Sequence, residues 1–206
     1  MCPRALAWTI GGIADALSSS LYAGLLGPAW ASLAPEVRAL HAGGAEARGR
    51  FRIVHGTGWL ARVLARVLRM PPASDGVDVT LSVERLDGGE RWTRWFGDRR
   101  LRSLQWSRGG QLVEGYGGMQ VVFRLEAEAG ALDFRQVGTR VGLRAVALPL
   151  PRWLAPRVQG RAAPGDDGVR VDIRIHAPLV GLIVAYEGCV APAGVAAHPP
   201  VAEAAT

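Results

Sequence analysis

Hydrophobic and polar side chains alternate along most of the chain beyond residue 76. Between residues 77 and 84, four hydrophobic side chains alternate with four polar ones. Because successive side chains of a strand point to opposite faces of a sheet, this pattern predicts half-buried β-strands. Glycine-rich turn signals separate them, which is typical of antiparallel hairpins. The predicted strands cover residues 50–55, 77–84, 91–96, 101–106, 111–116, 119–126, 132–137, 169–176 and 179–190.

A period near 3.6 residues precedes this alternation and predicts helices. The serines at 18–20 precede an apolar run that ends at Gly27-Pro28, and a second short helix is expected over Pro35–His41. The clearest helix is Trp59–Met70. Its hydrophobic face is expected to pack on the sheet and consists of Leu60, Val63, Leu64, Val67 and Leu68.

The opposite face of this helix is a stripe of Arg62, Arg66 and Arg69. A solvated face is the commoner explanation, and contact with an anionic membrane is the rarer one. Elsewhere, Gly43–Arg48 and Gly165–Gly168 are expected to be loops, and Leu148–Pro156 a proline-rich stretch with one helical turn.

Helices come first and strands second, which predicts the α+β class. About eight antiparallel strands are enough to curl into a half-barrel or a barrel whose interior holds one small ligand. The expected organisation is a flexible extension over 1–18, one α+β domain over 19–191 and a disordered Ala/Pro-rich tail over 192–206.

Charge and composition exclude several classes of protein. The net charge is +6, but every basic residue is arginine and the arginines are scattered, which disfavours a nucleic-acid track. Cys2 and Cys189 form no metal or redox spacing, so a reduced, cytoplasmic protein is expected. No stretch reaches the roughly 20 apolar residues of a transmembrane segment. No histidine has a second ligand at metal spacing, and no cofactor is expected.

The segment Gly56-Thr57-Gly58-Trp59-Leu60-Ala61 matches the GxGxxA pattern of dinucleotide-binding turns. The preceding strand carries Arg52 and His55, whereas a central parallel strand is nearly all apolar. No second strand–helix–strand unit follows. A tight strand-to-helix turn is therefore the preferred interpretation.

Candidate chemistry lies on two of the predicted strands. On one strand a single face carries Trp92, Arg94 and Phe96, and on another it carries Leu112, Glu114 and Tyr116. If these faces point inward, Arg94 and Glu114 are interior charges that must be paired with each other or with a ligand. A structural ion pair and an outward-facing charged face are the alternatives.

Two further residues are candidates for the site. Tyr186 offers a hydroxyl inside a cavity, although a strand tyrosine is more often a core residue with its tip at the surface. His41 ends a predicted helix, where a cation is favourable, so a capping role is expected.

The order of several short motifs resembles a known family. They include Trp92-x-Arg94-x-Phe96-Gly97, Glu114-x-Tyr116-Gly117, Leu148-Pro149-Leu150-Pro151 and Tyr186-x-Gly188. Over about residues 20 to 190 the chain resembles the bacterial family catalogued as domain of unknown function 4166. The resemblance brings no established activity, but it lends weight to Arg94, Glu114, His41 and Tyr186. It also implies a stand-alone copy of a domain that sometimes follows a saccharopine-dehydrogenase-like reductase domain.

Three hypotheses for function stay open from the sequence. The first is an accessory module that binds a small apolar or amphipathic ligand, with Trp92, Phe96 and Tyr116 as its wall. The second is an enzyme of unrecognised type in which Glu114 is the acid/base and Arg94 holds an anion. The third is a module that docks on an NADP-dependent reductase through an exposed apolar patch.

Overall fold

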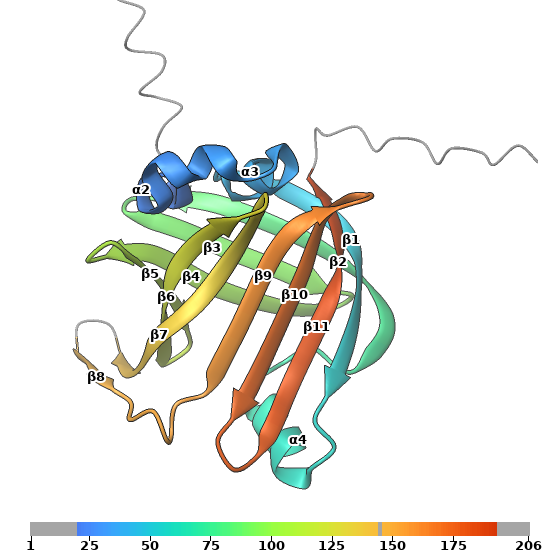
Figure 1. The fold of residues 1–206 in the computed structure, drawn as a ribbon. Helices are drawn as coiled ribbons and strands as arrows, with labels where there is room; N and C mark the ends of the chain where they lie inside the picture. The colour runs from blue at the N-terminus through green and yellow to red at the C-terminus, as the bar shows by residue number, and fades with distance from the viewer. Residues whose placement is uncertain (1–19, 144–145, 193–206) are drawn as a thin grey trace, which may run out of the picture.

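Ten antiparallel strands close into a barrel in the computed structural model of the chain, which describes residues 20–143 and 146–192 (Figure 1). The barrel strands are β1 (Glu46–His55), β2 (Ser74–Leu86), β3 (Gly89–Phe96), β4 (Arg99–Arg108), β5 (Gln111–Tyr116), β6 (Met119–Glu128), β7 (Ala131–Leu143), β9 (Arg157–Gly165), β10 (Gly168–Ala177) and β11 (Gly181–Pro192). Each strand pairs with the next one along the barrel, and the barrel closes where β1 pairs with β11.

On one of its edges, the strand β7 pairs with two different strands along its length. The first half of β7 pairs with β9 over Leu132–Arg135, and the second half pairs with the short strand β8 (Val146–Pro149). The Gln136 side chain lies where the β7–β9 ladder stops. Its Oε1 accepts the Val158 N–H at 2.6 Å and its Nε2 donates to the Pro156 carbonyl at 2.8 Å, so one side-chain amide replaces the missing backbone hydrogen bonds.

Three short helices cover one end of the barrel, here called the cap end (Figure 1). They are α2 (Leu21–Leu26), the 3₁₀ helix η1 (Gly27–Ser32) and α3 (Pro35–His41). Ser20 caps α2 through its hydroxyl, and Pro35 begins α3. The interior at this end is closed by their buried side chains, which are Tyr22, Val37, Leu40 and His41.

The fourth helix, α4 (Trp59–Val67), lies at the opposite end of the barrel, between β1 and β2 (Figure 1). The predicted buried face is only partly right, because Ala61 and Ala65 are the buried residues of the helix while Leu60, Val63 and Val67 are exposed. The small alanines allow the helix to approach the barrel closely, and Leu64 and Leu68 are only partly buried. Leu60, Val63 and Val67 are therefore left in solvent.

The predicted strands are all present, but the predicted number and the half-barrel alternative are wrong, since the described residues form eleven strands and the sheet closes. The sequence pattern misses β8 and β9. The strand β9 contains glycine, alanine and proline, and at Gly160 a Cβ would come into van der Waals contact with the Phe134 ring at 3.4 Å. The predicted 43–48 loop is also partly wrong, since β1 begins at Glu46. The predicted helical turn is a single turn at residues 151–155, in which the Pro151 carbonyl accepts from the N–H groups of Leu154 and Ala155.

The glycine-rich segment before α4 is a turn between antiparallel elements. β1 pairs antiparallel with both β2 and β11, so the segment does not belong to a parallel strand–helix–strand unit. A Cβ at Gly56 would lie 1.9 Å from the Leu182 carbonyl oxygen, which explains the glycine by close backbone approach.

The predicted extension over residues 1–18 lies outside the described residues, and so does the predicted tail beyond Pro192. The single α+β domain over 19–191 stays a prediction. Within the described ranges, no helix combines the length and the hydrophobicity that crossing a bilayer needs.

Candidate functional site

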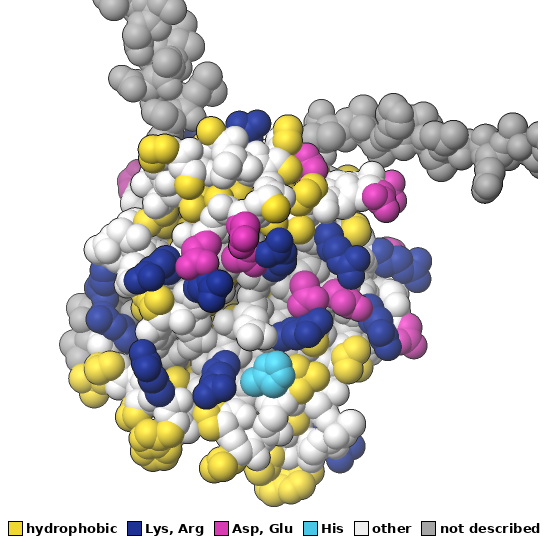
Figure 2. Space-filling view, in the orientation of Figure 1, with side chains coloured by type: hydrophobic (Ala, Val, Ile, Leu, Met, Phe, Trp, Pro, Cys, Tyr) yellow, Lys and Arg dark blue, Asp and Glu magenta, His cyan; other side chains and the backbone are white. Residues whose placement is uncertain are grey.

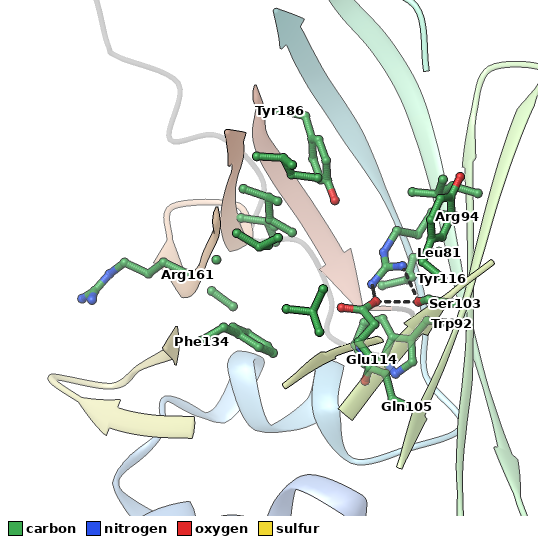
Figure 3. Close-up of a pocket in the computed structure, with 18 of the residues that line it drawn as sticks. Leu81, Trp92, Arg94, Ser103, Gln105, Glu114, Tyr116, Phe134, Arg161 and Tyr186 are labelled. Carbon is green, nitrogen blue, oxygen red and sulfur yellow. Dashed lines mark hydrogen bonds and ion pairs between the residues drawn. The ribbon is translucent and has the colours of Figure 1, made fainter. Parts of the chain in front are cut away.

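A cavity of about 150 Å³ lies inside the barrel (Figure 3). Most of its wall is apolar, with side chains from the cap-end helices and from strands on both sides of the barrel. Tyr22, Leu40 and His41 line it at the cap end. All seven residues predicted as site candidates line this cavity: His41, Trp92, Arg94, Phe96, Glu114, Tyr116 and Tyr186.

The strand register brings three polar side chains together on one wall of the cavity. Trp92 pairs with Ser103 across β3 and β4, and Gln105 pairs with Glu114 across β4 and β5. Ser103 is thus diagonally next to both Arg94 and Glu114, since cross-strand diagonal neighbours on one face are within side-chain reach. Arg94 and Glu114 come from strands that are not paired, and β4 lies between them.

Ser103 is the centre of this cluster (Figure 3). Its hydroxyl donates to Glu114 Oε1 at 2.6 Å and accepts from Arg94 Nη1 at 3.0 Å. The direct contact from Arg94 Nη2 to Glu114 Oε1 is 3.5 Å, which is long for a charge-assisted hydrogen bond. The two charges are therefore joined mainly through the serine hydroxyl.

The Arg94 guanidinium has hydrogen-bonding capacity to spare. Its Cζ lies 5.2 Å from the centre of the Trp92 ring, a distance at which a cation is attracted to the aromatic face. A guanidinium carries five N–H donors, and among the described residues only Ser103 and Glu114 accept from it. The side chain is 15% exposed, so the remaining donors face a largely enclosed space.

The Tyr186 hydroxyl points into the cavity from β11 (Figure 3). Burial raises the pKa of Tyr186 to about 12, with Arg94 acting in the opposite direction. Its ring packs edge-on against Phe96 at 5.6 Å, which fixes its direction. Within the described residues no hydrogen-bond partner contacts this hydroxyl, so it is a neutral donor in the cavity.

His41 lines the cavity at the cap end and is not the cationic helix cap that the sequence predicts. Burial lowers the pKa of His41 to about 4, so the ring is neutral near pH 7. Its Nδ1–H donates to the Val37 carbonyl at 2.8 Å, and the ring packs against Tyr22 at 4.7 Å and Trp92 at 5.5 Å. The prediction fails because α3 ends inside the core, where the ring is removed from water.

Tyr116 connects the cavity wall to α4. Its hydroxyl donates to the Leu68 carbonyl at 2.5 Å, so it holds the residue that follows the helix. Burial raises the pKa of Tyr116. Its polar end therefore serves the structure, while its ring contributes to the cavity wall.

The predicted site omits several buried polar residues, among them Tyr22, Glu90, Ser103 and Gln105. Tyr22 donates its hydroxyl to Gln105 Oε1 at 2.6 Å, and burial raises its pKa well above the usual value. Burial also raises the pKa of Glu90, which accepts from Trp92 Nε1 at 3.0 Å. The period-2 spacing of Glu90 from Trp92 and of Ser103 from Gln105 is the signal that would have found the strand residues.

Arg161 borders the cavity, but its side chain points away from it (Figure 3) and pairs with Asp133. Within residues 20–143 and 146–192, no group of three or more His, Cys, Asp or Glu is placed to hold a metal ion. The chemistry that the cavity offers is thus hydrogen bonding by Arg94, Glu114 and Tyr186 in apolar surroundings.

The fold and the cavity define a class, a closed antiparallel barrel with a mainly apolar interior and one polar cluster. The chain belongs to the family described as domain of unknown function (DUF4166), whose sequence model matches residues 33–189. The predicted family resemblance is therefore confirmed.

Two further comparisons add no functional information. A search of curated proteins found no match. One solved structure, a protein of unknown function from the DUF3598 family of Nostoc punctiforme PCC 73102, is similar with 14% sequence identity and a TM-score of 0.39. The match covers 71% of this chain and 46% of that chain, so this chain corresponds to less than half of the other protein.

Proposed function

We propose that the protein binds one small amphipathic ligand inside the barrel. The observation that carries the proposal is the Arg94–Ser103–Glu114 cluster inside an apolar cavity, with guanidinium donors left over. Ligand sites commonly combine a mostly apolar wall with a few polar groups that fix orientation.

The volume of the cavity limits the size of the ligand. An apolar cavity of about 150 Å³ takes up one benzene-sized molecule, and pockets for drug-sized ligands begin at roughly 300 Å³. The cavity has a volume of about 150 Å³. The apolar part of the ligand is therefore about one ring or a short aliphatic chain, in contact with Trp92, Phe96 and Tyr116.

The charges of the cluster select the polar part of the ligand. Arg94 offers donors, while Glu114 is an acceptor next to it. A carboxylate on the ligand would be attracted by Arg94 and repelled by Glu114. A neutral group that both accepts and donates, such as a primary amide, complements both side chains, and Tyr186 supplies another donor.

Isothermal titration calorimetry with benzamide, benzoate and toluene tests this assignment. The three probes share a ring that fits the cavity and differ only in the attached group. We expect benzamide to bind more tightly than toluene or benzoate. Replacing Arg94 by Lys keeps the charge but removes the planar fork, and is expected to weaken benzamide binding by roughly 10- to 100-fold, the equivalent of about 1.5–3 kcal/mol.

Arg102→Lys is the matched control, because Arg102 lies on β4 with its side chain exposed. It should leave all three affinities unchanged. Equal affinity for toluene and benzamide would show that the polar cluster plays no part in binding. Absence of binding by all three probes would refute the proposal for ligands of this size.

A further inference from the structure

Three segments at the α4 end of the barrel, opposite the cap end, carry exposed hydrophobic side chains. They are α4, the β8–β9 connection and the β10–β11 turn, which lie together at the bottom of Figure 1. Trp59 is 68% exposed and Val67 70% on α4, Trp153 is 73% exposed in the connection, and Leu179 is fully exposed at the turn. Figure 2 shows hydrophobic side chains along this lower edge.

Leu179 has two unfavourable features at once. Its φ is +63°, a left-handed conformation that non-glycine residues rarely adopt, and its side chain is entirely in water. Turn tips normally carry glycine, asparagine, aspartate or serine, which satisfy both requirements. A leucine at this tip points to an apolar environment outside the protein.

Two of these segments, α4 and the β8–β9 connection, are basic, and none of the three contains an acidic residue in its described part. Arg62, Arg66 and Arg69 lie on or next to α4, and Arg152 and Arg157 lie at the β8–β9 connection. The turns at the cap end include Asp87, Asp166 and Asp167, whereas the acidic residues nearest the α4 end are Asp75, which pairs with Arg52, and Asp98, which is next to Arg99 and Arg100. No acidic side chain is visible at the lower edge in Figure 2.

We propose that the α4 end of the barrel docks on an anionic membrane surface. Exposed tryptophan and aliphatic side chains enter the interfacial region of a bilayer, and arginines around them attract anionic headgroups. The hydrophobic residues stand on three separate projections at one end. A deformable, flat surface contacts all three at once, whereas a protein partner favours one contiguous, closely packed patch.

The arrangement of α4 supports this assignment independently. The helix turns Ala61 and Ala65 toward the barrel and packs Leu64 and Leu68 partly against the core, but it leaves Trp59, Val63 and Val67 outside. A helix that only completed the fold has no need of three large hydrophobic side chains on its outer face. The proposal concerns the outer surface and does not depend on the ligand inside the barrel.

Vesicle flotation with the full chain tests the proposal. The vesicles contain phosphatidylcholine alone or phosphatidylcholine with about 30% phosphatidylglycerol, a fraction that gives a strongly anionic surface. We expect binding to the anionic vesicles only, weakened by added salt. The charge variant R62E/R66E and the apolar variant W59S/L179S should each lose binding by about tenfold or more, because each removes one component of the attraction.

Matched controls change the same residue types elsewhere on the barrel. R108E/R124E alters two exposed arginines away from the α4 end, and L104S alters an exposed leucine on the outer wall of β4. Both controls should bind as the unchanged protein does. No binding of the unchanged protein to anionic vesicles, or equal losses in the controls and the α4-end variants, would overturn the proposal. Self-association through the α4 end without vesicle binding would identify a protein interface and overturn it as well.

Discussion

Acidification from pH 7 to pH 4 is expected to destabilise the fold through His41. Burial lowers the pKa of His41 from 6.5 to about 4. Between these two values the unfolded chain binds a proton at this residue and the folded chain does not. Because the unfolded state binds more protons, the free energy of unfolding falls as the pH falls through this window.

The size of the effect follows from the same two pKa values. Each pH unit between them corresponds to 1.36 kcal/mol, so the interval from 6.5 to about 4 amounts to about 3 kcal/mol. A domain of this kind has a total stability of about 5–15 kcal/mol, so the loss is a large fraction of it. The effect is complete near pH 4 and absent above about pH 7.

Urea unfolding at a series of pH values from 7 to 4 measures this loss. The reference is His41→Asn, whose side-chain amide can still donate to the Val37 carbonyl but does not titrate. The difference in unfolding free energy between the two proteins should change by about 3 kcal/mol across the series. Taking this difference removes the titration of groups that both proteins share.

Glu90 is the main such group, and its effect has the opposite sign. Burial raises its folded-state pKa above 4.5, so as the pH falls toward 4.5 it contributes stability rather than removing it. Glu90 is present in both proteins and cancels in the comparison. Parallel pH profiles for the two proteins would refute the reasoning, since they would mean that His41 ionises equally easily in the folded and unfolded states.

Two substitutions test other parts of the barrel by urea unfolding. Gln136→Ala removes the side-chain amide that joins β7 to the start of β9 and should cost about 1–3 kcal/mol, whereas Gln159→Ala on the exposed face of β9 should stay within about 0.5 kcal/mol. Equal losses of unfolding free energy in the two variants would show that the hydrogen bonds of the Gln136 side chain do not stabilise the fold. Gly56→Ala should cost about 1–3 kcal/mol, because its Cβ would lie 1.9 Å from the Leu182 carbonyl oxygen; Gly58→Ala, where a Cβ meets nothing within 4 Å, should cost little. A neutral Gly56→Ala would contradict the close approach of the two backbones.

The sequence predicts the consecutive antiparallel strands β2–β7 well, because each strand carries its own alternating pattern and is bounded by turn residues. Alternation and glycine turns locate the strands from residue 77 to residue 137. The prediction misses β9, because its glycine, alanine and proline residues have low strand propensity. This strand forms through its pairing with β7 and β10. The sequence also cannot show that the sheet closes, since the β1–β11 pairing depends on total twist and strand tilt.

The candidate site is predictable in its residues and less so in its geometry. Period 2 places Arg94 and Glu114 among inward-facing hydrophobic residues, so both become candidates. Their connection through Ser103 depends on the register of β4 between them, which single-strand patterns do not contain. The state of His41 depends on aromatic rings from distant elements, so the helix-end rule gives the wrong charge.

The pairing of β1 with β11 makes completion of the barrel the last event in synthesis of this region. β1 leaves the ribosome early, and its partner Gly181–Pro192 follows only after all the other strands that the structure describes. Until then, β1 and β10 each present an unpaired edge, the feature that promotes pairing between chains. Such sequence-distant pairings also slow folding. The nascent chain should therefore be most prone to aggregate, and most dependent on chaperones, just before β11 emerges.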